Sequence, residues 1–421
     1  MQEALLHYIW KSELFEQTEY TSDTGEIIEI IYPGQHNSDA GPDFTNARIK
    51  INETIWAGNV EIHVKASDWQ IHRHQENPAY DNTILHVVDE VDGECITSSG
   101  RKVPTITLNF NHSILKKYHQ LMLSDHEIRC AESLPRLDLS LIPFWLSALA
   151  VERLQQKTQS VRELLQQEEN SWEETFYIHL ARSFGLKTNS LPFEMLAKST
   201  PLKIVAKHAN SLFQLEALFF GQAGFLSGET EDDYQQKLHD EYVYLQKMHQ
   251  LKSLGKHIWK FMRLRPSNFP TLRIAEFCAL IHHSRGLFSR IIECEDIQEL
   301  HELLDGEVSE YWKQHYVFGK STKEQRKALG KNAKDLLIIN SIIPFTFVFG
   351  DYKNNEALKE KALRFLEAIA AEKNHIINEW SDLRVPARHA ADSQALIHLK
   401  QNYCIEGSCL DCQIGNLILK N

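Results

Sequence analysis

The chain has 421 residues, of which 43% are hydrophobic and 24% charged, and its formal net charge is −12. A chain of this length is expected to form two or three domains with sizeable cores. The acidic balance excludes non-specific coating of DNA, because that mode of binding depends on attraction to phosphate. We see no run of about 18 apolar residues and no cationic, apolar leader. We therefore expect a cytoplasmic protein that does not bind a membrane.

The first 110 residues predict alternating helical and extended elements. Residues 4–15 carry apolar side chains at helical spacing, whereas three later segments are rich in β-branched residues and are separated by turn sequences. The expected order is a helix (4–15), three strands (27–32, 44–51 and 54–65), a short helix (68–75), a strand (83–88) and a further strand (104–110).

After about residue 138 the hydrophobic pattern changes to a helical period. Helices are expected at 142–165, 174–184, 212–226, 272–292, 333–349 and 356–371. The sequence therefore predicts an α+β protein with a mixed-sheet domain over residues 1–130. An all-helical region over residues 131–421 follows it and ends in a cysteine-rich segment.

Charged residues gather around the second and third expected strands. Pro42-Asp43 directly precedes one strand, and Glu61, His63 and Lys65 alternate along the next. Alternation places these three side chains on one face, opposite the apolar ones. Asp43 and Glu61 from neighbouring strands can then hold Mg²⁺ or Mn²⁺ through oxygen. Lys65 would act with an attacking water, and His63 would serve as a ligand or proton carrier.

This arrangement resembles the PD-(D/E)XK nuclease superfamily, in the Pro42-Asp43 pair, the acid Glu61 and the order of elements. The resemblance implies a restriction-endonuclease-like sheet, divalent-metal-dependent hydrolysis of DNA or RNA, and a contribution from Glu3 or Glu13 of the first helix. The superfamily places its lysine two residues after the acid, where this chain has His63. Either Lys65 reaches back, or His63 takes over, or the protein is an inactive nucleic-acid-binding or scaffold protein.

Other groupings of the same residues are also possible. Glu61 and Lys65 would form a structural ion pair if the strand face were exposed to solvent. His63, His72, His74 and His86 could instead serve a metal hydrolase that acts on a small substrate and binds Zn²⁺. Against this, the side chains of His72 and His74 are expected to diverge, and His86 lies in an apolar strand where a core histidine is the usual outcome.

A second candidate metal site lies at the C-terminus, where Cys404, Cys409 and Cys412 follow a C-x4-C-x2-C spacing. Three thiols this close suggest Zn²⁺ or an iron–sulfur cluster, with Cys130 as the preferred fourth ligand and His398 as the alternative. Some nucleases of the superfamily carry such a four-cysteine cluster with one remote cysteine. Three free thiols are the alternative.

Basic residues in the helical region could contact the phosphate backbone of a nucleic acid. One group consists of Lys252, Lys256, Lys260, Arg263 and Arg265, and the first four are expected near one helical face. A second runs from Lys320 to Lys334. The simpler interpretation of both is a solvated helix surface.

Several strings together resemble an uncharacterised bacterial family that is known only as a domain of unknown function. They are DAGPDFTNARI, GNVEIHVKASDW, NPAYDNTILHVV, RPSNFPTLRIAEF, SQALIHLKQNYC and CLDCQIG. This resemblance spans nearly the whole chain and implies no particular activity.

Overall fold

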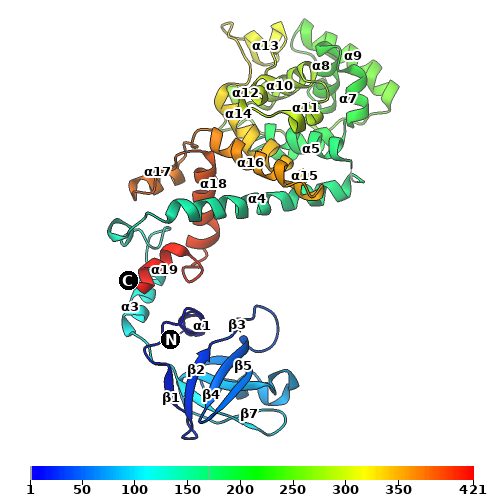
Figure 1. Ribbon diagram of the computed structural model, residues 1–421. Helices are drawn as coiled ribbons and strands as arrows, with labels where there is room; N and C mark the ends of the chain where they lie inside the picture. Colours follow the sequence, from blue (N-terminus) through cyan, green and yellow to red (C-terminus); the bar gives the residue numbers. More distant parts are fainter. Residues whose placement is uncertain (1, 170) are drawn as a thin grey trace. The chain divides into compact units, whose positions relative to one another are not determined.

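The computed structural model describes residues 2–169 and 171–421. The chain forms two compact units (Figure 1). The first combines residues Met1–Ile142 with Leu399–Asn421, and the second comprises Pro143–His398. The first unit contains a mixed sheet and the second is mainly helical, which confirms the predicted α+β class.

The sheet of the first unit follows the order β1-β2-β4-β5-β6-β9. Its first four strands pair antiparallel, whereas β5, β6 and β9 run parallel to one another. Helix α1 (Glu3–Lys11) precedes the sheet, and the short helix α2 (Asp68–Ile71) lies in the crossover between β5 and β6. The predicted helix, three strands, short helix and strand occur in the expected order, and two short strands that were not predicted, β1 and β3, lie among them. The strands are β1 (Glu19–Thr21), β2 (Ile27–Tyr32), β3 (Gln35–His36, paired with β4), β4 (Phe44–Ile51), β5 (Thr54–Lys65), β6 (Thr83–Glu90), β7 (Cys95–Ile96), β8 (Lys102–Val103) and β9 (Thr105–Thr107).

Turn residues fix the limits of these elements. The β4–β5 hairpin turns at Asn52, which adopts a φ of 52°, a conformation that asparagine tolerates better than most residues. The first helix ends at Lys11, four residues before the predicted end. Glu13 leaves the helical region with a φ of 51°, and Phe15 forms a β-bridge with Phe110 instead.

Both faces of β5 are buried around its centre, because Glu61 and His63 are as inaccessible as Val60 and Ile62. An exposed polar face would be usual on an antiparallel sheet. Here the parallel β5–β6 crossover folds α2 and the turn η1 (His74–Glu76) over the polar face. The ionisable residues of β5 therefore lie in an enclosed space.

Helices fill most of the second unit. The predicted helix over 272–292 is two helices, because the chain breaks at Ser284 and turns at Gly286 with a φ of 63°. The first helix of this unit begins at the boundary between the units, and the last helix ends there. The helices are α4 (Ile142–Gln167), α5 (Trp172–Phe184), α6 (Ser190–Lys198), α7 (Leu202–His208), α8 (Leu212–Gln222), α9 (Asp233–His249), α10 (Pro270–His283), α11 (Leu287–Glu293), α12 (Ile297–Leu303), α13 (Glu310–Gln314), α14 (Lys331–Leu337), α15 (Ile343–Tyr352), α16 (Glu356–Ala368), α17 (His375–Asp382) and α18 (Ala390–Leu399). A short hairpin, β10 (His315–Val317) and β11 (Lys320–Ser321), lies among them.

In the part of the chain that the structure describes, one helical stretch, Lys331–Tyr352, is long and apolar enough to cross a membrane. It joins α14 and α15 through a π-helical turn, Ile338–Ile342. The most apolar window of this stretch is 72% buried inside the structure, as expected for a core helix.

The C-terminal segment belongs to the first unit. After a π-helical turn (Lys400–Cys404), helix α19 (Gln413–Lys420) packs against α3 (His112–Met122). Residues from opposite ends of the sequence thereby share one core.

Candidate metal centre

Asp43 and Glu61 meet where β4 begins beside β5. The backbone N–H of Asp43 donates to Glu61 Oε2 at 3.1 Å, and the N–H of Ile62 donates to Asp43 Oδ2 at 2.9 Å. The two carboxylates of neighbouring strands thus lie side by side, and each is oriented by a backbone amide. Burial raises the pKa of Glu61, and the adjacent charge of Asp43 raises it further.

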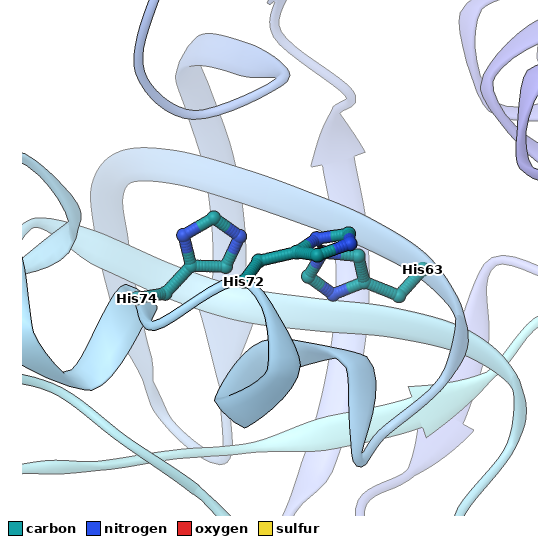
Figure 2. A group of neighbouring side chains, drawn as sticks. All are labelled: His63, His72 and His74. Atoms are coloured by element: carbon teal, nitrogen blue, oxygen red, sulfur yellow. Dashed lines mark hydrogen bonds between the residues drawn. The ribbon is translucent and has the colours of Figure 1, made fainter.

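Three histidines gather beside Glu61. The ligand atoms of His63, His72 and His74 all lie within 4.8 Å of one another, and Figure 2 shows the three rings drawn together. His72 Nδ1 lies 3.1 Å from His63 Nε2. Glu61 Oε1 lies 3.1 Å from His74 Nε2 and 3.6 Å from His63 Nε2. Ligands at Zn–N distances of about 2.0–2.1 Å and tetrahedral angles are separated by about 3.3 Å, so these contacts have the spacing of a metal's ligands.

One buried atom is left unsatisfied in this cluster. His74 Nε2 makes no hydrogen bond among the described residues, although Glu61 Oε1 is only 3.1 Å away. The distance is short but the direction does not suit an N–H donor. A buried polar atom without a partner is costly, and a cation between the nitrogen and the carboxylate would satisfy both. The residues present therefore fit a metal ion.

A left-handed residue explains why His72 and His74 converge. His72 ends α2, Arg73 adopts φ 60° and ψ 35°, and His74 begins η1. In a continuous helix, residues two apart point in different directions. The reversal at Arg73 turns both rings toward His63, with centroid separations of 4.9 Å and 5.3 Å. The prediction that these two side chains diverge is wrong. Because residue 73 is arginine and not glycine, the sequence did not indicate this reversal of the chain.

Burial keeps His63 neutral. Desolvation, with smaller effects of the neighbouring His74 and His72, lowers the pKa of its imidazole to about 4. A neutral imidazole has the free lone pair that metal coordination requires.

His86 of β6 supports His63 from inside the sheet. It is fully buried, and its Nε2 lies 2.8 Å from His63 Nδ1. Its Nδ1 lies 2.8 Å from Cys95 Sγ. His86 is thus a core histidine, as its apolar strand predicted, but it contacts a candidate ligand directly.

The first helix adds an acid and a base. His7 Nε2 lies 3.3 Å from Asp43 Oδ2. Burial lowers the pKa of His7, but the contact with Asp43 and the charge of Glu3 outweigh burial and raise it. Burial raises the pKa of Glu3, which interacts electrostatically with His7, Asp43 and His72. Of the two acids considered on this helix, Glu3 thus lies near the site, whereas Glu13 follows the helix end.

Tyr80 closes one side of the cluster. Its ring stacks on His74 with a centroid separation of 3.9 Å. Burial raises the pKa of Tyr80 to about 12, aided by the charges of Glu61 and Asp43.

Lys65 lies apart from these residues. Its Nζ is 2.9 Å from Glu90 Oε2 at the exposed end of the sheet, because the parallel register pairs Lys65 with Glu90. The Glu61–Lys65 ion pair that we considered is therefore not formed.

The other predicted residues lie in two further places. Those of the first basic group are exposed in the second unit. They do not share a helical face, because α9 ends at His249 and only 3₁₀ turns follow, Lys256–Ile258 and Pro266–Asn268. That part of the prediction is wrong. Lys327 and Lys334 of the second basic group are buried and bonded to backbone carbonyls. Cys130, Cys404, Cys409 and Cys412 are all buried in the first unit, whereas His398 contacts Glu152 in the second.

Fold and site together define an α+β protein with a cluster of histidines and carboxylates that is buried except at His72 and is suited to a metal ion. The sequence model of one family, described as protein of unknown function (DUF2851), matches residues 3–375. The chain belongs to this family, as its sequence strings indicated. Neither a curated protein nor a solved structure matches the chain.

Proposed function

We propose that the protein is a metal-dependent hydrolase that cleaves phosphodiester bonds in nucleic acid. The observation that carries the proposal is the convergence of His63, His72 and His74 on Glu61, next to Asp43. Three imidazoles and one carboxylate suit Zn²⁺ or Mn²⁺. Mg²⁺, which the sequence also suggested, prefers an all-oxygen site.

Each residue has a definite task in this proposal. His63, His72, His74 and Glu61 would hold the cation, which when bound would polarise the scissile phosphate and acidify a water. Asp43 Oδ2 lies 3.3 Å from His7 Nε2, and its charge favours the protonated imidazole. The protonated His7 would then serve as the general acid for the leaving oxygen. The burial of Glu61, His63 and His74 strengthens these electrostatic interactions, whereas the exposed His72 leaves the site open to a water.

Nucleic acid is proposed as the substrate on the strength of the sequence-based resemblance to PD-(D/E)XK nucleases. Asp43 directly precedes β4 and lies beside Glu61 of β5, and α1 supplies Glu3, an acid that the resemblance implied. The same helix adds His7, which the resemblance did not imply. The exposed basic residues of the second unit, Lys252, Lys256, Lys260, Arg263 and Arg265, supply positive charge for phosphate contacts.

The test is cleavage of single- and double-stranded DNA and RNA with Mn²⁺, Zn²⁺ or Mg²⁺, and with a chelator as the blank. We expect His74→Ala to reduce the rate at least about 100-fold, because second-shell losses alone cost about 10–100-fold and His74 is a candidate ligand. The control is Lys65→Ala, which removes an exposed ion pair that solvent screens and should leave the rate within about twofold. Equal rates for wild type and His74→Ala would contradict the proposal.

A second candidate is a non-catalytic protein of the same fold that binds nucleic acid or serves as a scaffold. The observation that favours this candidate is the position of Lys65, whose amine is paired with Glu90 and not with Asp43 or Glu61. This candidate would be preferred if nucleic acid bound but was cut with none of the three metals.

A further inference from the structure

Four buried cysteines in the first unit lie close to one another and outside the histidine cluster. Cys130 follows α3, whereas Cys404, Cys409 and Cys412 surround the turn before α19. Each is at most 7% exposed, and all seven cysteines of the chain are free thiols. Burial raises the pKa of Cys130 and Cys404, and the other cysteines of the group raise both further.

Several contacts hold the two segments together. Arg129, next to Cys130, donates from Nε to the carbonyl of Cys404 at 3.0 Å and from Nη1 to that of Met122 at 2.7 Å. Gly415 allows the first turn of α19 to pack against the backbone of Cys409, because a Cβ at residue 415 would lie 1.9 Å from the Cys409 carbonyl oxygen. The fold thus fixes the backbone around the thiols.

Backbone N–H groups lie beside the Cys412 thiol, whose pKa burial raises to about 12. The backbone N–H groups of Ile414 and Gly415 at the start of α19 lower the pKa of Cys412 against the larger effect of burial. Backbone N–H groups that point at sulfur are common around metal-bound cysteines, where they tune the bound metal.

We infer that Cys130, Cys404, Cys409 and Cys412 bind a thiophilic metal centre, either one zinc ion or an iron–sulfur cluster. Both can be held by four thiolates. Binding would deprotonate the thiols and release their protons to solvent. Among the described residues, the histidine group is the one whose ligand atoms all lie within 4.8 Å of one another. A zinc ion would have to draw the more widely spaced sulfurs together, whereas a cluster spans more distance.

The same segment lines a cavity beside the histidine site. Leu410 and Asp411, between Cys409 and Cys412, lie on one wall of a cavity of about 400 Å³, and His7 and His36 lie on another. A metal at the cysteines would fix this wall. This part of the inference rests on the proposed function: loss of the cysteine-bound metal would raise the KM for substrate more than it lowers kcat.

The test is metal, iron and sulfide analysis of the full chain purified without oxygen, with a visible absorption spectrum. We expect about one zinc ion or one coloured cluster per chain at this site. Cys404→Ser and Cys412→Ser should each lower this content at least about tenfold. The control is Cys294→Ser, because Cys294 is buried and donates to the Asp296 carbonyl at 3.1 Å, a bond that serine can reproduce. Visible colour with sulfide identifies a cluster, and its absence with bound zinc identifies a single ion.

Two further arms separate the possible failures. His74→Ala should keep the cysteine-bound metal, so the site is measurable even if the protein hydrolyses nothing. A mercurial added to native wild-type protein should release the metal, which tests the site even if the serine variants do not fold. Wild-type protein that stays metal-free after incubation with zinc, and with iron plus sulfide, would overturn the inference. Unchanged content in Cys412→Ser would do the same.

Discussion

At the scale of single residues, the hydrogen bonds of His63 and His86 fix where their protons lie. His63 Nε2 faces the other candidate ligands, so its proton belongs on Nδ1, which donates to His86 Nε2. His86 then carries its own proton on Nδ1 and donates to Cys95 Sγ. The thiol of Cys95 can in turn donate to the carbonyl of Ala66 at 3.7 Å. His86 is therefore a positioning residue that selects the tautomer of a metal ligand.

This chain of bonds predicts the effect of replacing His86. His86→Phe removes the acceptor for His63 Nδ1–H and should weaken metal binding about 10–100-fold. His86→Gln keeps an acceptor oxygen at this position and should weaken binding by less than about threefold. Competition with a chromophoric chelator for Zn²⁺ or Mn²⁺ measures both affinities. Equal losses in the two variants would show that His86 acts through packing alone.

At the scale of elements, the site depends on the turn that joins α2 to η1. His72 and His74 face His63 only because Arg73 is left-handed. A residue other than glycine in the left-handed conformation destabilises the fold by about 1–2 kcal/mol. This backbone strain lies at the turn that brings two candidate ligands together. Arg73 is itself exposed, so its backbone matters here more than its side chain.

Substitutions at Arg73 test this role. Arg73→Ile places a β-branched residue at positive φ, which is more strained, and should weaken metal binding about 5–30-fold, the equivalent of about 1–2 kcal/mol. Arg73→Asn removes the same charge but tolerates the left-handed region, so it should bind metal about as well as wild type. A metal titration of both variants decides the point. Equal affinities would mean that the turn is held by its surroundings whatever residue occupies it.

Much of the sheet was predictable from the sequence, and the reasons are local. The bounds of β2, β4 and β5 match the predicted strands, because β-branched runs alternate with turn residues there. Asp43 and Glu61 were predicted to meet because a hairpin joins their strands. The position of Lys65 was not predictable, because its partner Glu90 depends on the parallel register with β6. That register is set by the crossover between these strands and not by a turn.

At the scale of the whole molecule, the first unit is built from two separate parts of the chain. Residues 399–421 return to the unit formed by the first 142 residues, and this return brings Cys404, Cys409 and Cys412 to Cys130. Sequence spacing suggested the three C-terminal cysteines and Cys130 was preferred as the fourth ligand, and the fold places all four in one unit. The family match ends at residue 375, so these three cysteines lie beyond it.

The second unit contains a buried acid whose titration affects the stability of the fold. Glu216 of α8 is fully buried, and its Oε2 accepts hydrogen bonds from Tyr234, Ser309 and Trp312. Burial raises the pKa of Glu216 to about 7, from 4.5. The folded state therefore binds a proton more tightly than the unfolded state. This contribution to stability is complete below pH 4.5 and is lost as the pH rises toward 7.

Glu216→Gln should remove this dependence, because glutamine keeps an acceptor oxygen and does not titrate. We compare the unfolding free energy of the variant with that of wild type. Raising the pH from 4.5 to 7 should shift this difference by up to about 3 kcal/mol in favour of the variant, because each pH unit corresponds to about 1.4 kcal/mol. Urea unfolding followed by circular dichroism between pH 4.5 and 8 measures this difference. The control is Glu173→Gln, an exposed position in the same unit, whose difference from wild type should stay nearly constant. If the curves of Glu216→Gln and wild type run parallel over this range, the buried carboxyl is not protonated in the folded protein, and the hydrogen bonds from Tyr234, Ser309 and Trp312 must outweigh the cost of burying its charge.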